Sequence, residues 1–454
     1  MAVHKITAGL DLPITGAPGE EVDETIQVTR VAVCADDYPL MKPRMHVSVG
    51  DEVKRGQLLF EDRKAEGVRF TAPEAGKVLA VNRGDKRVLQ TVVIELSEAA
   101  RDGHGAQVEL EATPSADMDG KALRALMAET GLWAALRARP YGRVPKPTED
   151  AAAIFVTAID TAPLAGSMKV ILAGRDAELG AGLKALTKLT TGKVYLCAAP
   201  DAGLPSVPGV QLEEFSGKHP AGLPGTHIHT LEPVSRSKTV WHLGAQDVVA
   251  LGALLTTGQI DSSRVVALGG PAVTKPRLIK TLLGARVSEL TAGGLDATVE
   301  ARCVAGSVLD GRKAEGEIWD YLGRYHQQVS CLAEDRERVF LGWLKPGGDK
   351  FSSIRAFAAS WLGGATKRFA MTTSTHGSHR AMVPIGMFER VMPLDILPTF
   401  LLRALLVGDL ERAEQLGCLE LIEEDLSLCS FVSPGKENFA EALRENLDTI
   451  WKEG

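Results

Sequence analysis

The chain has 454 residues, of which 45% are hydrophobic, and its 51 basic and 58 acidic residues leave a formal net charge of −7. This hydrophobic content supplies several packed cores, so the composition excludes a globally disordered chain. The basic residues form no stripe, which argues against nucleic-acid binding and against docking on anionic lipid by charge alone.

Cysteine usage and hydropathy predict a cytoplasmic protein. Residues 1–16 lack the apolar core of a signal peptide. No uncharged apolar run reaches the roughly 18 residues of a spanning helix, and the nearest run, 396–408, contains Pro398 and Arg403. The cysteines have no framework spacing, which is typical of free thiols in a reducing compartment. They are Cys34, Cys197, Cys303, Cys331, Cys418 and Cys429. We therefore expect membrane contact only through a partner.

Residues 1–100 are predicted to form an N-terminal segment and a small β domain. Apolar and polar residues alternate between 26 and 96, with turn glycines at short spacing. The string V-x-x-G-D-x-V-x-x-G-Q-L at 47–58, followed by A-P-x-x-G-K-V at 72–78, resembles the biotinyl/lipoyl carrier fold. A barrel-sandwich of short strands is therefore expected.

Residues 101–262 are predicted to form a polar linker (100–120) and then a Rossmann-like α/β domain. Helix-like and strand-like segments alternate there, which is typical of a parallel sheet. Strands are expected at 152–158, 169–174, 193–199 and 209–215, and helices at 121–130, 175–190 and 244–257. Asp176 is the expected cap of the second helix, and Asp247 lies near the start of the third.

The last two predicted domains are 263–335 and 336–454. Residues 263–330 give a strand, a Gly-Gly-Pro turn, a second strand, a short helix and more strand, an order that resembles a β-grasp domain of the soluble-ligand-binding (SLBB) kind. A polar, glycine-rich stretch at 345–380 precedes a helical domain, in which Leu397, Leu401 and Leu405 recur at spacing four. Helices are expected to continue through 410–431 and 439–453. The fold class is thus α+β with several domains.

The loop at 131–145, GLWAALRARPYGRVP, joins a helix to a strand where nucleotide-binding α/β domains carry small residues. Glycine at such a position lets the backbone approach phosphate oxygens. Only Gly131 and Gly142 are present here, among bulky and basic residues. We therefore predict an α/β domain without its phosphate cradle. The bulky and basic residues are Trp133, Leu136, Arg137, Arg139, Pro140 and Tyr141.

Other residues with chemical potential favour structural roles. Lys64 lies near the position of a carrier domain's modified lysine, and we interpret it as a surface lysine. His227 and His229 alternate as on a strand and would share one face, yet the other candidate ligands, His376 and His379, have no acidic neighbour in sequence. A structural or interface role is favoured over a metal site.

No nucleophile motif of the G-x-S-x-G kind is present. Cys34, which follows an apolar strand, is interpreted as a core thiol or a pocket-lining residue rather than a nucleophile. We assign no catalytic residue and no metal ligand.

Several long strings resemble the NqrA family, which belongs to the sodium-translocating NADH:quinone oxidoreductases and is related to the flavin-bearing subunit of respiratory complex I and to the RnfC protein of the Rnf complex. The resemblance runs along the whole chain. It is carried by residues 9–18, 56–73, 82–96, 155–164, 219–229, 240–248, 265–273, 322–329, 382–399 and 417–436.

The resemblance implies that two cofactor sites of the relatives are missing. The relatives' flavin cradle corresponds to the bulky loop at 131–145. Their iron–sulfur ligands correspond to a stretch that keeps Cys429 but has Phe431, Val432 and Ser433 where further cysteines are expected, with Cys418 eleven residues away. Because a cluster needs three or four closely set thiolates, we expect no flavin and no iron–sulfur cluster in this chain.

The function implied by the resemblance is that of a peripheral, non-redox subunit on the cytoplasmic side of the bacterial inner membrane. The enzyme would reduce ubiquinone and export Na⁺. NADH, flavins, iron–sulfur clusters and Na⁺ would be handled by other subunits, of which the membrane subunit with the quinone site is the expected partner. A soluble flavoprotein oxidoreductase and a ligand-free assembly scaffold remain as alternatives.

The family is associated with ubiquinone binding, and two loops are the expected places for it. One is 35–45, where Tyr38, Met41 and Met45 offer apolar surface and Arg44 offers a donor to a quinone carbonyl. The other is 131–145, and a partner interface explains both loops equally well. The candidate residues are Tyr38, Met41, Arg44, Met45, Trp133, Leu136, Arg137, Arg139 and Tyr141.

Overall fold

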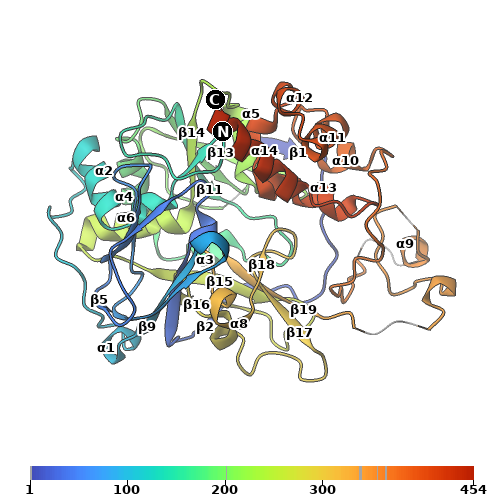
Figure 1. Cartoon of the computed structure of the whole chain (residues 1–454), viewed down its shortest axis with the longest axis horizontal. Helices are drawn as coiled ribbons and strands as arrows, with labels where there is room; N and C mark the ends of the chain where they lie inside the picture. Colours follow the sequence, from blue (N-terminus) through green and yellow to red (C-terminus); the bar gives the residue numbers. More distant parts are fainter. Residues whose placement is uncertain (1–2, 201, 337–339, 355, 363–365, 454) are drawn as a thin grey trace.

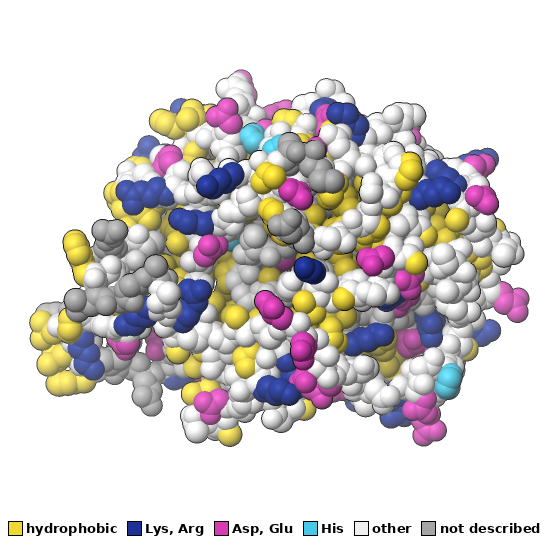
Figure 2. All heavy atoms as spheres, turned by 180° about the vertical axis from the view of Figure 1, so that it is seen from behind, with side chains coloured by type: hydrophobic (Ala, Val, Ile, Leu, Met, Phe, Trp, Pro, Cys, Tyr) yellow, Lys and Arg dark blue, Asp and Glu magenta, His cyan; other side chains and the backbone are white. Residues whose placement is uncertain are grey.

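A computed structural model of the chain describes residues 3–200, 202–336, 340–354, 356–362 and 366–453. A barrel-sandwich, an α/β domain, a β-grasp domain and a helical domain follow one another along the chain (Figure 1). This α+β arrangement confirms the predicted fold class. Basic and acidic side chains are interspersed over most of the face seen from behind in Figure 2.

The barrel-sandwich consists of two small antiparallel sheets, with strand orders β3-β9-β8-β5 and β4-β6-β7. Turns at Gly50 and Gly56, both with positive φ, reverse the chain where the sequence predicted turns. The strands are β3 (Arg30–Cys34), β4 (Pro43–Met45), β5 (Glu52–Val53), β6 (Leu58–Asp62), β7 (Arg69–Thr71), β8 (Gly76–Arg83) and β9 (Leu89–Leu96), and α1 (Glu98–Arg101) follows.

The first two strands lie outside the barrel with which the sequence grouped them. β1 (Val3–Ile6) pairs in parallel with β13 of the α/β sheet. β2 (Val22–Thr25) pairs in parallel with β16 of the β-grasp sheet. Both strands cover sheet edges, which satisfies backbone groups that would otherwise lack partners. The N-terminal segment therefore ties two later domains together.

The α/β sheet has the order β1-β13-β12-β11-β14-β10, and all its strands except β10 are parallel. The strand order reverses between β11 and β14. The strands are β10 (Arg137–Arg139), β11 (Ala153–Ala158), β12 (Lys193–Ala198), β13 (Val210–Gly217) and β14 (Val240–Gly244). The helices are α2 (Gly120–Glu129), α3 (Met168–Ile171), α4 (Asp176–Leu186), α5 (Pro224–Leu231) and α6 (Ala245–Thr257).

Two predictions for this domain are wrong in detail. The strand expected at 169–174 is instead the short helix α3, and its buried residues Met168, Ile171 and Leu172 follow the i, i+3, i+4 spacing of a helix face. Asp176 is the first residue of α4 rather than its cap, which is Arg175. The helices predicted at 121–130 and 244–257 are confirmed as α2 and α6.

The β-grasp sheet has the order β18-β17-β19-β15-β16-β2 and confirms the predicted sequence of strands and short helix. Its own elements are β15 (Ser263–Gly269), β16 (Arg277–Leu282), α7 (Val287–Leu290), β17 (Ala301–Ala305), β18 (Arg312–Lys313), α8 (Gly316–Trp319) and β19 (Gln328–Ala333).

The C-terminal domain is helical, as predicted, but the helix expected over 410–431 is broken. Gly417, with a φ of 96°, ends the first helix, and single turns at Cys418–Glu420 and Glu423–Leu426 precede the next. The helices are α9 (Ala359–Leu362), α10 (Met387–Val391), α11 (Pro398–Val407), α12 (Leu410–Gln415), α13 (Ser427–Val432) and α14 (Phe439–Glu453). No helix in the described part of the chain is long and apolar enough to cross a membrane.

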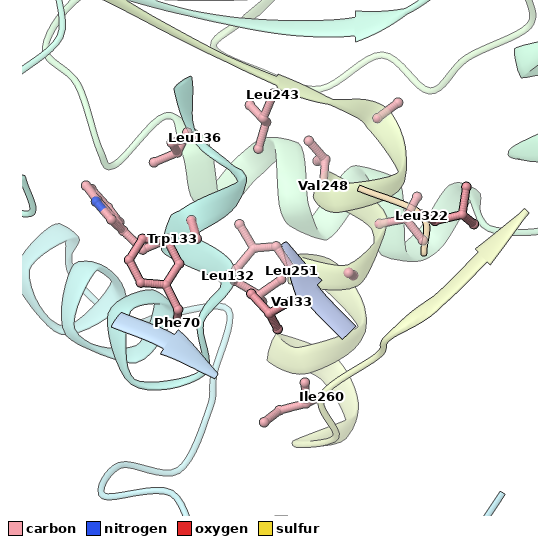
Figure 3. Packing of buried hydrophobic residues seen from close by; sticks show 14 of the residues in the cluster. Val33, Phe70, Leu132, Trp133, Leu136, Leu243, Val248, Leu251, Ile260 and Leu322 are labelled. Atoms are coloured by element: carbon pink, nitrogen blue, oxygen red, sulfur yellow. The ribbon is translucent and has the colours of Figure 1, made fainter. Parts of the chain in front are cut away.

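One apolar core runs through the first three domains. Figure 3 shows Val33 and Phe70 of the barrel beside Leu132 and Trp133 of the loop that follows α2. Val248 and Leu251 of α6 lie in the same cluster, together with Leu322 of the β-grasp domain. The loop at 131–145 therefore sits at the junction of three domains.

Candidate functional site

The loop at 131–145 folds into the interior. Trp133 and Leu136 are fully buried. The Trp133 indole nitrogen donates to the Pro145 carbonyl oxygen at 2.7 Å, and the ring lies edge-on to Trp241 at 5.4 Å between centroids. The guanidinium of Arg124 lies over both rings. These contacts make Trp133 and Leu136 core residues, without surface for a partner in this structure.

The same loop does not fit a flavin phosphate. A phosphate cradle needs free backbone N–H groups at an accessible turn. Here the Ala134 amide donates to Gly131, the Leu136 amide to Trp133, and the Ala138 amide to Arg143. Arg137 to Arg139 then form β10, which pairs antiparallel with β14 at the sheet edge. The loop thus uses these N–H groups in its own turns, and its last part pairs with the sheet edge.

Arg137 and Arg139 hold the C-terminal domain against the sheet. Arg139 is fully buried, and its Nη1 atom lies 2.6 Å from the carboxylate of Asp425 and 2.9 Å from the Glu420 carbonyl oxygen. Glu424 is within 3.4 Å of both arginines. Burial raises the pKa of Asp425, although the Arg139 charge opposes this shift. The two arginines, predicted to face a quinone or a partner, instead make an ionic contact within the chain.

The two tail thiols do not fit an iron–sulfur cluster. Cys418 belongs to a 3-10 turn and Cys429 to α13, and both side chains lie in the apolar core of the helical domain. Burial raises the pKa of each thiol to about 12, which disfavours the thiolate that a cluster requires. The described residues contain no group of three or more His, Cys, Asp or Glu arranged to hold a metal ion.

Tyr38 and Met41 line a cavity of about 150 Å³ between the barrel and the C-terminal helix. Tyr38 is buried, and its ring centre lies 4.3 Å from that of Phe70. Burial raises the pKa of its hydroxyl well above the usual value, so the hydroxyl stays protonated. The cavity is lined by Tyr38, Pro39, Leu40, Met41, Asp62, Lys64, Ala65, Phe70, Arg143, Val144, Lys146 and Trp451, and we call it the aromatic cavity.

Arg143 and Trp451 belong to the aromatic cavity but were missed in the sequence. Arg143 lies over the Trp451 ring at 4.6 Å and pairs with Glu149 at 2.8 Å. Tyr141, a predicted site residue, meets the other side of this region, because its ring lies edge-on to Trp451 at 4.9 Å. Trp451 is in the last turns of α14, and no local pattern connects it with a loop some four hundred residues earlier.

Arg44 and Met45 are separated from this cavity. Both belong to β4, and neither lines the aromatic cavity. The Arg44 side chain is 62% exposed and pairs with Glu61 at 3.1 Å. Met45 packs partly buried against the main core. Of the nine predicted residues, the structure therefore brings only Tyr38 and Met41 together in the aromatic cavity, with Tyr141 beside it.

A second hollow, also of about 150 Å³, lies where the strand order of the α/β sheet reverses. In open α/β sheets this is the usual ligand position. Thr157 lies near the end of β11 and Asp160 follows that strand, Gly244 ends β14, and Glu424 contributes from the helical domain. Burial raises the pKa of Asp160 to about 6. The hollow is small for a nucleotide, since small-molecule sites usually measure about 300–1,000 Å³.

The histidine pair is not a metal site. His227 and His229 lie on α5, not on a strand, because Pro224 at the first turn starts a helix. Residues two apart on a helix point in different directions. The Nε2 atom of His227 donates to the Ala221 carbonyl oxygen at 2.9 Å, as the neutral ring allows. The Nδ1 atom of His229 lies 2.7 Å from a carboxylate oxygen of Glu420.

Lys64 and Cys34 lie where the structural interpretations put them. Lys64 is exposed in the turn between β6 and β7. Cys34 ends β3, fully buried, and burial raises the pKa of its thiol to about 12. A thiol of this kind is unreactive at neutral pH.

Family models match three parts of the chain. They are described as the NqrA N-terminal barrel-sandwich hybrid domain (residues 4–97), the NqrA second alpha/beta domain (118–260) and the NQRA C-terminal domain (265–316). The matched segments correspond to the barrel, the α/β sheet and the β-grasp sheet.

Relatives match along the whole length, and each is named as the A subunit of a Na(+)-translocating NADH-quinone reductase. The relative from Shewanella amazonensis is 50% identical over 453 residues, 99% of each chain. That from Pseudomonas aeruginosa is 51% identical over 455 residues, 99% of this chain and 100% of the relative. That from Rhodopirellula baltica is 49% identical over 460 residues, 100% of this chain and 99% of the relative. The chain therefore belongs to the NqrA family of Na(+)-translocating NADH-quinone reductase subunits.

Proposed function

We propose that this chain is the peripheral NqrA subunit of a sodium-translocating NADH:ubiquinone reductase, lies on the cytoplasmic side of the membrane, and binds the ubiquinone ring in the aromatic cavity. The full-length identity to relatives of that name supports the assignment to the complex. The six free cysteines, which a reducing compartment favours, support the cytoplasmic side.

The aromatic cavity has the chemistry for a quinone ring and a volume near that of an unsubstituted ring. A cavity of about 150 Å³ accommodates a benzene-sized molecule. Tyr38 and Trp451 supply aromatic surface, and Met41 supplies an adaptable thioether. Arg143 supplies a charged donor for a quinone carbonyl oxygen. This combination of flat apolar surface and one strong donor is the observation that carries the proposal.

In this proposal the chain carries no redox group. Backbone N–H groups of the loop at 131–145 donate to carbonyl oxygens of the same loop. The two tail thiols are buried in the core of the helical domain. NADH, flavins, iron–sulfur clusters and Na⁺ are then handled by the other proteins of the complex, and this chain contacts the membrane protein that reduces quinone. Its contribution is to hold the quinone ring, without a chemical step.

Fluorine NMR tests ring binding directly. The chain has six tryptophans, so 5-fluorotryptophan labelling gives six resonances, and Trp451→Phe identifies one of them. Titration with a short-tailed soluble ubiquinone is expected to shift the Trp451 resonance, while that of buried Trp241 stays in place. If the Trp451 resonance does not move at saturating quinone, the chain is a ligand-free scaffold.

A substitution supplies the second readout. Replacing Arg143 with Ala removes a charged hydrogen bond, so quinone affinity is expected to fall about tenfold or more. The matched control is Arg83→Ala on β8, an exposed arginine outside the cavity, which should leave the affinity unchanged. Equal affinities for both variants would place the ring elsewhere.

A further inference from the structure

An apolar surface projects from the helical domain between residues 340 and 380. Four large hydrophobic side chains are strongly exposed there, in contrast to the buried cores of the four domains. Phe340 is 85% exposed, Trp361 71%, Leu344 61% and Ile354 50%. Water-exposed rings and aliphatic side chains gathered on one segment mark an interaction surface. We call residues 340–380 the basic lobe; its described residues, 340–354, 356–362 and 366–380, lie around α9 in Figure 1.

The basic lobe is also strongly cationic. In sequence it holds six lysines and arginines against one acidic residue, Asp349, in a chain whose net charge is −7. Figure 2 shows blue and yellow side chains together on the lobe, at the left of the view. Its basic residues are Lys345, Lys350, Arg355, Lys367, Arg368 and Arg380.

The described cations of the lobe are not neutralised by the rest of the molecule. No ion pair within the described ranges involves Lys345, Lys350, Lys367 or Arg368. Lys367 donates to the Gly348 carbonyl oxygen, which ties two stretches of the lobe together without cancelling charge. Lys345 and Arg368 are exposed, and half-buried Lys350 and Lys367 lie over aromatic rings of the lobe. The uncancelled positive charge therefore lies beside the exposed hydrophobic side chains.

We propose that the basic lobe binds the surface of an anionic phospholipid bilayer. Lysine and arginine beside exposed aromatic and aliphatic side chains are the combination that holds proteins at the headgroup boundary, where rings enter the interface and cations contact phosphate. Because the chain as a whole has a negative net charge, we expect lipid binding to need both the cations and the exposed hydrophobic side chains of the lobe. The negative net charge of the whole chain conceals this local cluster of basic residues. The structure shows that exposed hydrophobic residues lie in the same segment.

Charge favours lipid over a membrane-embedded protein as the occupant. The cytoplasmic loops of membrane proteins carry an excess of lysine and arginine, which repels a cationic lobe. The cytoplasmic leaflet carries a negative surface potential, which attracts it. The inference rests on the proposed cytoplasmic position of the chain, but the lipid affinity is a property of the chain alone and is measurable without the rest of the complex.

The test is flotation of the purified full-length chain with large unilamellar vesicles. One set is phosphatidylcholine with about one-third phosphatidylglycerol, and the other is pure phosphatidylcholine. Flotation with the anionic set is expected, and it should weaken at raised ionic strength because surface charges are screened. Equal flotation with both sets, or no flotation with either, would overturn the proposal.

Variants separate the lobe from the rest of the surface. The charge variant Lys345→Gln/Arg368→Gln is expected to lower vesicle affinity by at least about tenfold, since each cation near an anionic surface contributes about fivefold. The apolar variant Phe340→Ser/Leu344→Ser should lower it by about tenfold or more as well. Matched controls on the barrel are Lys54→Gln/Lys77→Gln and Val49→Ser/Val88→Ser, which alter exposed residues far from the lobe in sequence.

The outcomes are distinct from those for quinone. If the control variants lose vesicle affinity as strongly as the lobe variants, the lobe is not the binding surface. If the lobe variants bind vesicles normally but fail to assemble with the rest of the complex, the lobe is a protein interface, and the lipid proposal is wrong. Neither result affects the Trp451 resonance, which reports on the aromatic cavity alone.

Discussion

At the scale of single residues, buried histidines contribute to the pH dependence of stability. His227 is fully buried, and its ring lies 4.2 Å from that of Phe215. Its Nε2 atom lies 2.9 Å from the Ala221 carbonyl oxygen. Burial lowers the pKa of His227 to about 3 and that of His219 to about 4. Both rings are therefore neutral in the folded protein at ordinary pH.

This burial predicts acid sensitivity with a definite sign. In the unfolded chain His227 regains a pKa near about 6.5 and binds a proton that the folded chain excludes. Stability is therefore complete above about pH 6.5 and is lost as the pH falls toward the folded pKa of about 3. At pH 5 the loss from one such histidine is about 2 kcal/mol.

Urea unfolding at pH 7 and pH 5 measures this loss. His227→Gln, which keeps a donor for Ala221 but cannot take up a proton, is expected to show a smaller difference between the two pH values than the unchanged chain. The control is His104→Gln, an exposed histidine in the linker. An identical pH dependence for the His227 variant and the unchanged chain would show that this ring is not the source.

Sequence patterns were sufficient for residues whose role is set by their own strand. Cys34 follows an apolar strand, and it is a core thiol. Sequence patterns were insufficient for His227 and His229, because two histidines at alternate positions are compatible with either a strand or a helix. Pro224, three residues before His227, was the available signal for a helix start.

At the scale of elements, the loop at 131–145 is the main difference between expectation and structure. Its composition predicted the absence of a phosphate cradle, and in the structure several of its backbone amides are hydrogen-bonded within the loop. What the composition did not show is that the loop becomes β10 and that its arginines reach a segment near residue 425. A contact between such distant segments leaves no local pattern in the sequence. The sequence alone therefore does not distinguish arginines of an exposed interface from arginines of a buried ionic contact.

The Arg139 contact is expected to be important for stability. Because Arg139 and Asp425 are both buried, Arg139→Ala leaves an unpaired acid in the interior and should cost about 3–5 kcal/mol. Arg139→Met/Asp425→Leu, which removes both charges, should recover part of this loss. Arg236→Ala, at an exposed pair with Glu414, is the control and should cost less than about 1 kcal/mol.

Thermal and urea denaturation of the four proteins provide the measurement. The predicted order of stability is the unchanged chain and the Arg236 variant first, the double variant next, and Arg139→Ala last. If Arg139→Ala were as stable as Arg236→Ala, the ionic contact would not be what holds the helical domain to the sheet.

At the scale of the whole molecule, the long-range pairings join the domains. β1 and β2 complete sheets that lie some two hundred or more residues later in the chain, and α14 returns to the barrel and places Trp451 beside Tyr38. Domain types and their order were predictable, because each type has its own local pattern and the resemblance spans the chain. The aromatic cavity was not, because it is assembled from segments at opposite ends of the sequence.

The absence of a redox group in this chain is the central proposal, and it concerns the molecule as a whole. The α/β domain has its sheet edge completed by β10, and the helical domain keeps its thiols in an apolar core. In this proposal, electron transfer belongs to the partner proteins and this chain binds quinone.

The most direct test is the visible absorption spectrum of the purified full-length chain after dialysis, together with flavin and iron analysis. The account predicts only the aromatic band of the protein itself, without stoichiometric flavin or iron. Bands near about 370 and 450 nm, or a broad brown absorption with bound iron, would contradict it.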